Sequence, residues 1–101
     1  MSNEMVFLTD EILRQAVEQQ LQNEFDTHDF IFTLMSDFPR DYTQQLNECL
    51  DHEDPFIKLH TRIGRRLASK EFNDSLKQLH RKRISRNCRG KDDECEIWAK
   101  V

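Results

Sequence analysis

Basic side chains are concentrated between residues 58 and 91, and their chemistry is the most informative in the chain. Lys58, Arg62 and Arg65 follow one another at helical spacing, and further lysines and arginines continue to Lys91. Guanidinium and ammonium groups bind phosphate oxygens, and arginine can also bond the edge of a base. This pattern predicts a surface that binds a polyanion, with nucleic acid as the leading class of ligand.

The charge is divided unequally along the chain. Residues 1–54 hold two basic and thirteen acidic residues, a net charge of −11, whereas residues 55–91 hold twelve basic and two acidic residues, a net charge of +10. Residues 92–101 carry −3, so the whole chain has only −4 and its pI near 5.5 conceals the basic half. Such asymmetry indicates nucleic acid, a membrane surface or an acidic protein as partner. The alternative is that the two halves neutralise each other, within one chain or across a dimer.

The cysteines and histidines offer metal-binding atoms, but their spacing does not indicate a metal site. No CxxC or HxxxH pair occurs, and Cys88 and Cys95 are separated by six residues across an expected turn. Structural zinc sites usually show closer pairs. We therefore expect no metal, and interpret Cys49, Cys88, Cys95 and His60 mainly as packed side chains, as is common for free cysteine.

Catalytic signals are equally sparse. Only Gly64 and Gly90 are present, so no glycine-rich loop can cradle a phosphate. Cys49 and His52 lie three residues apart, as a nucleophile and its base can, yet no oxyanion donors accompany them. We expect a protein that is not an enzyme and that needs no cofactor.

Length and composition favour one small helical domain. A chain of 101 residues fits a single domain, and two glycines with two prolines are too few for a many-stranded barrel or sandwich. No apolar run is long enough to span a bilayer. The chain has three cysteines, an odd number, which fits a reducing compartment better than a framework of disulfides. We therefore expect a cytoplasmic protein without a membrane partner.

Capping residues and apolar spacing predict five helices. Thr9 and Thr27 are suited to cap the first two, Pro39 opens the third, and Asp54-Pro55 opens the fourth. The helices are expected at about 9–25, 27–38, 39–50, 55–69 and 74–83. A glycine-containing polar loop then separates 84–88 from 95–99, which predicts a hairpin. Gly64, near the packed face of the fourth helix, suggests close approach of another backbone.

Two helices joined by a short turn and followed by a hairpin with arginines near its tip are the parts of a winged helix-turn-helix. Over residues 55–101 the chain resembles that superfamily. The resemblance implies that 74–83 is the recognition helix in the major groove and that 84–101 is the wing. Acidic Asp92, Asp93 and Glu94 beside the wing tip oppose contact with DNA.

The resemblance also implies which residues between 58 and 91 contact bases and which contact phosphates. Ser75, Gln78, Arg81 and Lys82 would face the bases, and Arg62, Arg65, Arg86, Arg89 and Lys91 would bind phosphates. Lys58, Arg66 and Lys77 complete the expected nucleic-acid-binding residues.

These observations predict a mainly α fold of about five helices with a small C-terminal two-stranded hairpin, winged-helix-like. One domain would span 1–101, with an acidic helical part (1–54) and a basic part (55–101). The expected function is non-catalytic DNA binding, as a small regulator or a phage or mobile-element protein. The alternative is a protein-interaction or inhibitor module whose acidic half, including Asp29, Asp37 and Asp41, mimics phosphates. A homodimer through the apolar stripe of the first helix is also plausible.

Overall fold

The computed structural model describes residues 5–101, which form four α-helices and a three-stranded antiparallel sheet. This is a mixed α/β fold, so the expectation of five helices with a two-stranded hairpin is wrong in part. The elements in chain order are α1 (Asp10–Gln19), β1 (Glu24–Asp26), α2 (Thr27–Asp37), α3 (Pro39–Asn47), α4 (Pro55–Leu67), the 3₁₀ turn η1 (Lys70–Phe72), β2 (Leu76–Arg86) and β3 (Asp92–Lys100).

The predicted helix starts are largely confirmed by capping hydrogen bonds. The Thr9 side chain accepts from the Ile12 N–H at α1, and the Asp54 side chain accepts from the Ile57 N–H at α4. Helix α2 is capped by Asp26 rather than by Thr27, and Asp29 completes a capping box. Local chemistry therefore determines where these helices begin.

The first helix is shorter than predicted, because the chain leaves it at Gln20. Leu21, expected on the apolar face, is 98% exposed. Phe25 belongs to strand β1, where it is buried and pairs with Trp98 of β3. The apolar stripe of α1, formed by Leu13 and its neighbours, is used in the core of the same chain rather than left free for a dimer.

The expected helix at 74–83 is wrong, since these residues belong mainly to β2. This strand pairs with β3 from Leu76↔Lys100 to Arg86↔Asp92, with a bulge between Gln78 and Lys82. The hairpin is confirmed but its first strand begins eight residues earlier than the predicted 84. Propensity for helix in a Lys-, Gln- and Leu-rich segment is overridden here by pairing with β3.

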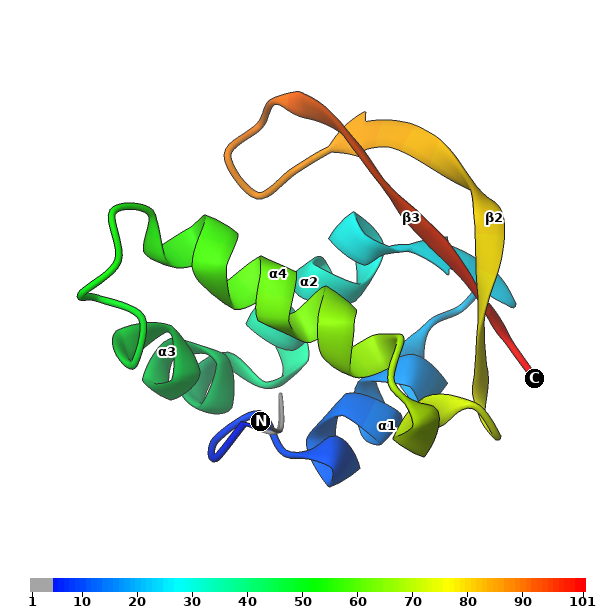
Figure 1. Cartoon of the computed structure of the whole chain (residues 1–101), viewed down its shortest axis with the longest axis horizontal. Coiled ribbons are helices and arrows are strands. Elements are labelled where there is room, and N and C mark those ends of the chain that lie inside the picture. The colour runs from blue at the N-terminus through cyan, green and yellow to red at the C-terminus, as the bar shows by residue number, and fades with distance from the viewer. Residues whose placement is uncertain (1–4) are drawn as a thin grey trace.

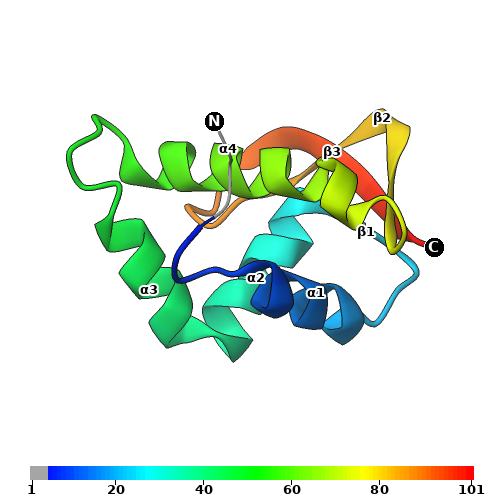
Figure 2. The same ribbon diagram turned by 60° about the horizontal axis from the view of Figure 1, so that its bottom comes forward.

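The sheet has the order β1-β3-β2, so the last strand lies between the other two. Figure 1 shows the β2–β3 hairpin arching over α4, with its loop above the N-terminal part of that helix. In Figure 2, α4 lies along one side of the molecule and α1, α2 and α3 lie below it. The helix and the hairpin that face each other here are separated in the chain only by the short turn η1 and its flanking residues.

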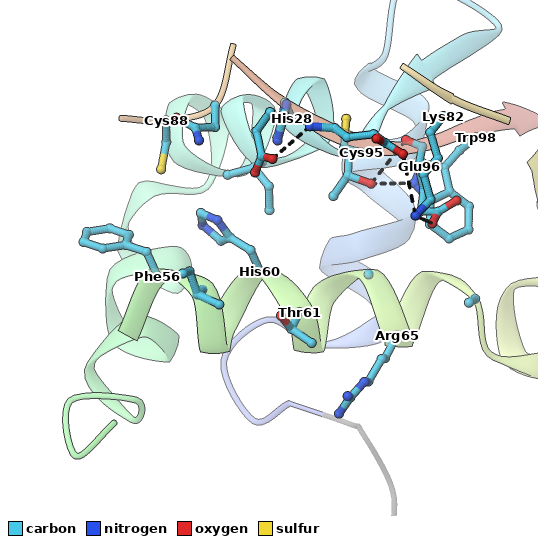
Figure 3. A pocket seen from close by; sticks show the side chains of 18 of the residues that line it. His28, Phe56, His60, Thr61, Arg65, Lys82, Cys88, Cys95, Glu96 and Trp98 are labelled. Atoms are coloured by element: carbon cyan, nitrogen blue, oxygen red, sulfur yellow. Dashed lines mark hydrogen bonds and ion pairs between the residues drawn. The ribbon is translucent and has the colours of Figure 1, made fainter. Parts of the chain in front are cut away.

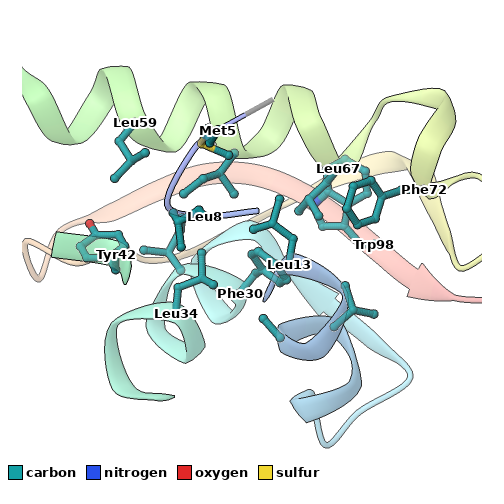
Figure 4. Packing of buried hydrophobic residues seen from close by; sticks show 14 of the residues in the cluster. Met5, Leu8, Leu13, Phe30, Leu34, Tyr42, Leu59, Leu67, Phe72 and Trp98 are labelled. Carbon is teal, nitrogen blue, oxygen red and sulfur yellow. The ribbon is translucent and has the colours of Figure 1, made fainter. Parts of the chain in front are cut away.

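The hydrophobic core lies between α4 and the layer of α1 and α2 (Figure 4). Leu59 and Leu67 approach it from α4, and Phe30 and Leu34 approach it from α2, all with at most 2% exposure. Trp98 closes the core from the sheet and donates from Nε1 to the Thr27 hydroxyl at 2.9 Å. Because Leu59 and Leu67 of α4 point into this core, the residues on the other faces of the helix are the ones that solvent can reach.

Candidate functional site

The solvent-facing side of α4 carries a basic stripe of Lys58, Arg62 and Arg65. Leu59 and Ile63 are buried on a neighbouring face of the helix, so Arg65 is exposed while Lys58 and Arg62 at the flank are half-buried. Arg65 is exposed and is one of the residues that line the groove between α4 and the hairpin, although the end of its side chain extends away from the hairpin (Figure 3). Within residues 5–101, no carboxylate forms an ion pair with any of the three.

Most basic side chains of the hairpin, by contrast, have acidic partners. Lys82 Nζ lies 3.7 Å from a Glu96 carboxylate oxygen and 3.9 Å from one of Glu94. Arg86 Nε lies 4.0 Å from an oxygen of Asp92. Asp92 and Glu94, two of the three acidic residues expected to oppose DNA contact at the wing tip, therefore neutralise cations of the neighbouring strand.

Several ion pairs join the acidic half of the chain to the basic half. The pairs are Asp10–Arg66, Glu24–Arg81, Asp26–Arg83, Asp29–Arg83 and Asp54–Arg89. Internal neutralisation, one of the two interpretations of the charge asymmetry, accounts for these residues. It does not account for the stripe on α4.

The structure separates the predicted nucleic-acid-binding residues into distinct environments. Arg66 is buried and lies in the core, so it cannot belong to an exposed stripe. Gln78, Arg81 and Lys82 project from a strand rather than from a recognition helix, and Gln78 donates to Glu96 at 2.9 Å. The half-buried Ser75 hydroxyl accepts from Arg14.

The remaining predicted residues lie in the hairpin. Lys77 and Lys91 are exposed, and neither forms an ion pair with a described residue. Arg89 pairs with Asp54 and lies over the Phe56 ring at 5.3 Å from its centroid. Through Arg89 the loop of the hairpin, which carries Lys91, is attached to the N-terminal end of α4 (Figure 1).

The loop itself is held by Asn87 and Gly90. The Asn87 side chain accepts from the N–H groups of Arg89 and Lys91, and Gly90 has a φ of 76° that suits glycine. The loop that presents the arginine is therefore ordered by its own turn chemistry.

A groove of about 550 Å³ lies between α4 and the hairpin (Figure 3). On the α4 side Phe56, Ile57 and His60 line it, and Trp98 lines its base. Its hairpin wall carries both signs of charge, because it includes Lys82 and Arg89 together with Asp93, Glu94 and Glu96. A mixed-charge wall of this kind is unfavourable for a phosphate backbone inside the groove.

His60 points into the groove and bonds its neighbour Tyr42. The Tyr42 hydroxyl and His60 Nε2 are 2.7 Å apart. Burial lowers the pKa of His60 to about 4, so the ring is neutral at pH 7 and can accept the phenol proton. Burial also raises the pKa of Tyr42, which keeps its hydroxyl a donor. The sequence-based interpretation of His60 as a packed residue agrees with this pair.

At the inner side of the groove, Asp26, His28 and Cys95 form a cluster of possible metal ligands. Their ligand atoms all lie within 4.8 Å of one another, and Asp26 is buried. Ser85 is adjacent, with its Oγ 2.6 Å from His28 Nδ1 and 3.7 Å from Cys95 Sγ. Burial alone would raise the pKa of Asp26, but hydrogen bonds from the Asp29 N–H and from Ser85, with the charge of Arg83, hold it below its usual range.

Sequence reasoning missed this cluster because its members come from three elements. Asp26 ends β1, His28 lies in the first turn of α2, and Cys95 lies on β3. The only signal in the sequence is the Asp-x-His pair at 26 and 28, which has no nearby partner in the chain. The pairing of β1 with β3, which the sequence analysis did not foresee, brings Cys95 to them.

None of the helices among residues 5–101 has the length and apolar character needed to cross a membrane. Comparison with known proteins finds no matching family model, no similar curated sequence and no similar solved structure.

Proposed function

We propose that this protein is a non-catalytic DNA-binding module that contacts the phosphate backbone through the outer face of α4. The observation that carries the proposal is the difference between two sets of basic residues. Lys58, Arg62 and Arg65 on α4 form no ion pair with a described carboxylate, whereas most cations of the hairpin do. Free cations gain more from phosphate contact, because no existing ion pair is lost.

The order of the elements gives further support. A basic helix followed, after the short turn η1, by a β-hairpin resembles the corresponding parts of a winged helix-turn-helix. In this proposal α4 is the helix that contacts the DNA backbone, and the β2–β3 hairpin is the wing. Lys91 at the hairpin loop would add a fourth phosphate contact.

The groove sets the direction from which DNA approaches. The cations of the hairpin wall, Lys82 and Arg89, are already ion-paired, and acidic residues lie beside them, so the wall offers a phosphate backbone no free cation. The phosphate backbone would instead run outside the groove, along α4 and past the hairpin loop that carries Lys91. These contacts position the module and do not by themselves read a base sequence.

The test is binding of the purified protein to a mixed-sequence DNA duplex over a salt series, measured by fluorescence anisotropy. For B-DNA the slope of log K against log salt is about −0.9 per phosphate neutralised, so four contacts give a slope of about −3.6. The triple variant Lys58→Ala, Arg62→Ala, Arg65→Ala should reduce the slope to about −0.9.

A matched control removes three exposed cations that already have partners: Arg81→Ala, Lys82→Ala, Arg86→Ala. Both triple variants change the net charge equally, so a general charge effect would weaken them alike. The proposal expects near-normal binding from the control. Equal losses, or no binding by the wild type at low salt, would refute it. In the latter case, the acidic side chains Asp37 and Asp41 become the first candidates for a protein-binding surface.

A further inference from the structure

We propose that Asp26, His28 and Cys95 bind a Zn²⁺ ion at the inner side of the groove. The three ligand atoms, one oxygen, one nitrogen and one sulfur, lie within 4.8 Å of one another. The inference is separate from DNA binding, since none of the three residues lies on the basic stripe of α4. His28 and Cys95 line the groove, which supplies a route for an ion from solvent.

The chemistry of the ligand set favours zinc over the common alternatives. Thiolate and imidazole ligands suit Zn²⁺, whereas Mg²⁺ and Ca²⁺ prefer oxygen. Zinc bonds of about 2.0 to 2.3 Å in tetrahedral geometry separate ligand atoms by roughly 3.5 Å. The present separations of up to 4.8 Å need to shorten by roughly 1 Å, within reach of side-chain rotation at half-buried His28 and Cys95.

Neighbouring groups already orient two of the ligands. Ser85 Oγ lies 2.6 Å from His28 Nδ1, an outer contact of the kind that fixes the ring of a metal-binding histidine. Asp26 is held because one oxygen accepts from the Asp29 N–H at 2.8 Å and the other from Arg83 Nε at 3.0 Å. With the hydrogen bond from Ser85 as well, the carboxylate still retains one free lone pair.

Arg83 is the group that must adjust when the ion binds. Its guanidinium neutralises Asp26, and a cation beside the same carboxylate would compete with it. The Arg83 side chain is 43% exposed, so it can turn toward solvent or toward Asp29, which it also approaches at 3.5 Å. Water from the groove would complete a fourth coordination position, as in zinc sites with three protein ligands.

The test is titration of the full, reduced and chelator-treated protein with Co²⁺, a spectroscopic substitute for Zn²⁺. A cysteine thiolate bound to Co²⁺ gives a charge-transfer band in the near ultraviolet. We expect this band in the wild type, its loss when Zn²⁺ is added in equimolar amount, and its loss in Cys95→Ser. The matched control is Cys88→Ser, since Cys88 is also half-buried and lines the same groove. It should keep the band.

Two further variants separate coordination from a structural effect. Ser85→Ala leaves all three ligands in place and should weaken Co²⁺ affinity about 10- to 100-fold, as expected for an outer-shell partner. His28→Asn should abolish binding, with far-ultraviolet circular dichroism confirming that the variant is folded. The absence of a band in the wild type would overturn the proposal. So would a band that survives Cys95→Ser or disappears in Cys88→Ser.

Discussion

Arg66 of α4 lies in the core and donates from Nε to Asp10 Oδ1 at 2.7 Å and from Nη2 to Asp10 Oδ2 at 2.5 Å. The two residues are 56 positions apart, and the pair connects the last turn of α4 to the first turn of α1. The negative charge of Asp10 lies at the positive N-terminal end of the α1 dipole. The positive charge of Arg66 lies near the negative C-terminal end of the α4 dipole, so both placements are favourable. A residue that the sequence analysis assigns to nucleic-acid binding therefore contributes to the packing of α4 against α1 instead.

Replacement of Arg66 should destabilise the protein without weakening DNA binding. The side chains of Arg66 and Asp10 are only 7% and 26% exposed, so Arg66→Met should lower the free energy of unfolding by about 3 kcal/mol. The double variant Asp10→Ala, Arg66→Met should lose less than the sum of the single variants, because the pair is removed as a unit. Urea unfolding measures both. Additive losses would show that the pair contributes no coupling.

A buried glutamine should prove as important as a core leucine. Gln45 of α3 is 2% exposed, and its Oε1 accepts from the backbone N–H groups of Phe7 and Leu8 at 2.8 and 3.1 Å. Gln45→Leu would leave both donors unsatisfied, which should cost about 2 to 3 kcal/mol in urea unfolding. Gln44→Leu is the control, since Gln44 is exposed on the same helix and should change stability by less than about 0.5 kcal/mol.

The two glycines should respond in opposite directions to alanine. A Cβ at Gly64 would meet no atom within 4 Å, so the predicted close approach of another backbone is wrong. Gly64→Ala should therefore raise the free energy of unfolding by about 0.5 to 1 kcal/mol through helix propensity. Gly90→Ala should lower it, because φ is +76° there. Thermal unfolding of the two variants in parallel checks both signs, and destabilisation by Gly64→Ala would contradict this interpretation.

Local signals predict the helices of this fold better than they predict its sheet. Asp54 and Pro55 mark the start of α4 through short-range chemistry, and the structure confirms it. The three-residue strand β1 has no such signal, because it exists through pairing with residues 97–99 of β3. Segment 74–83 fails for the same reason: its partner strand lies beyond a turn, and side-chain spacing alone does not reveal it.

The two candidate sites differ in the same way, because one is defined by local sequence spacing and the other by contacts between distant segments. The stripe of Lys58, Arg62 and Arg65 is visible in the sequence because helical spacing defines it. Which cations are free is not visible, since ion pairs such as Arg81–Glu24 depend on the fold. The cluster of Asp26 and Cys95 likewise depends on two strands that pair across most of the chain.

Acidification should destabilise the protein in a window set by His60. Burial lowers the pKa of His60 to about 4 in the folded state, against about 6.5 when unfolded. Between these values the unfolded state binds more protons, so stability falls as the pH drops from about 6.5 to about 4 and this loss stops below that. The difference corresponds to about 3 kcal/mol. The carboxylate of Asp10 acts in a separate, lower window, because its hydrogen bond from Arg66 holds its pKa below the usual value.

The measurement is urea unfolding at several pH values between 7 and 4 for three proteins. His60→Gln removes the titrating ring while keeping a side chain that can bond the Tyr42 hydroxyl, so its stability should change less over this window. His52→Gln removes an exposed ring and should retain the full slope of the wild type. If the slope is the same in all three proteins, His60 is not the group that couples protonation to folding. A loss of slope in His60→Gln alone would establish the buried Tyr42–His60 pair as the acid-sensitive element of the groove.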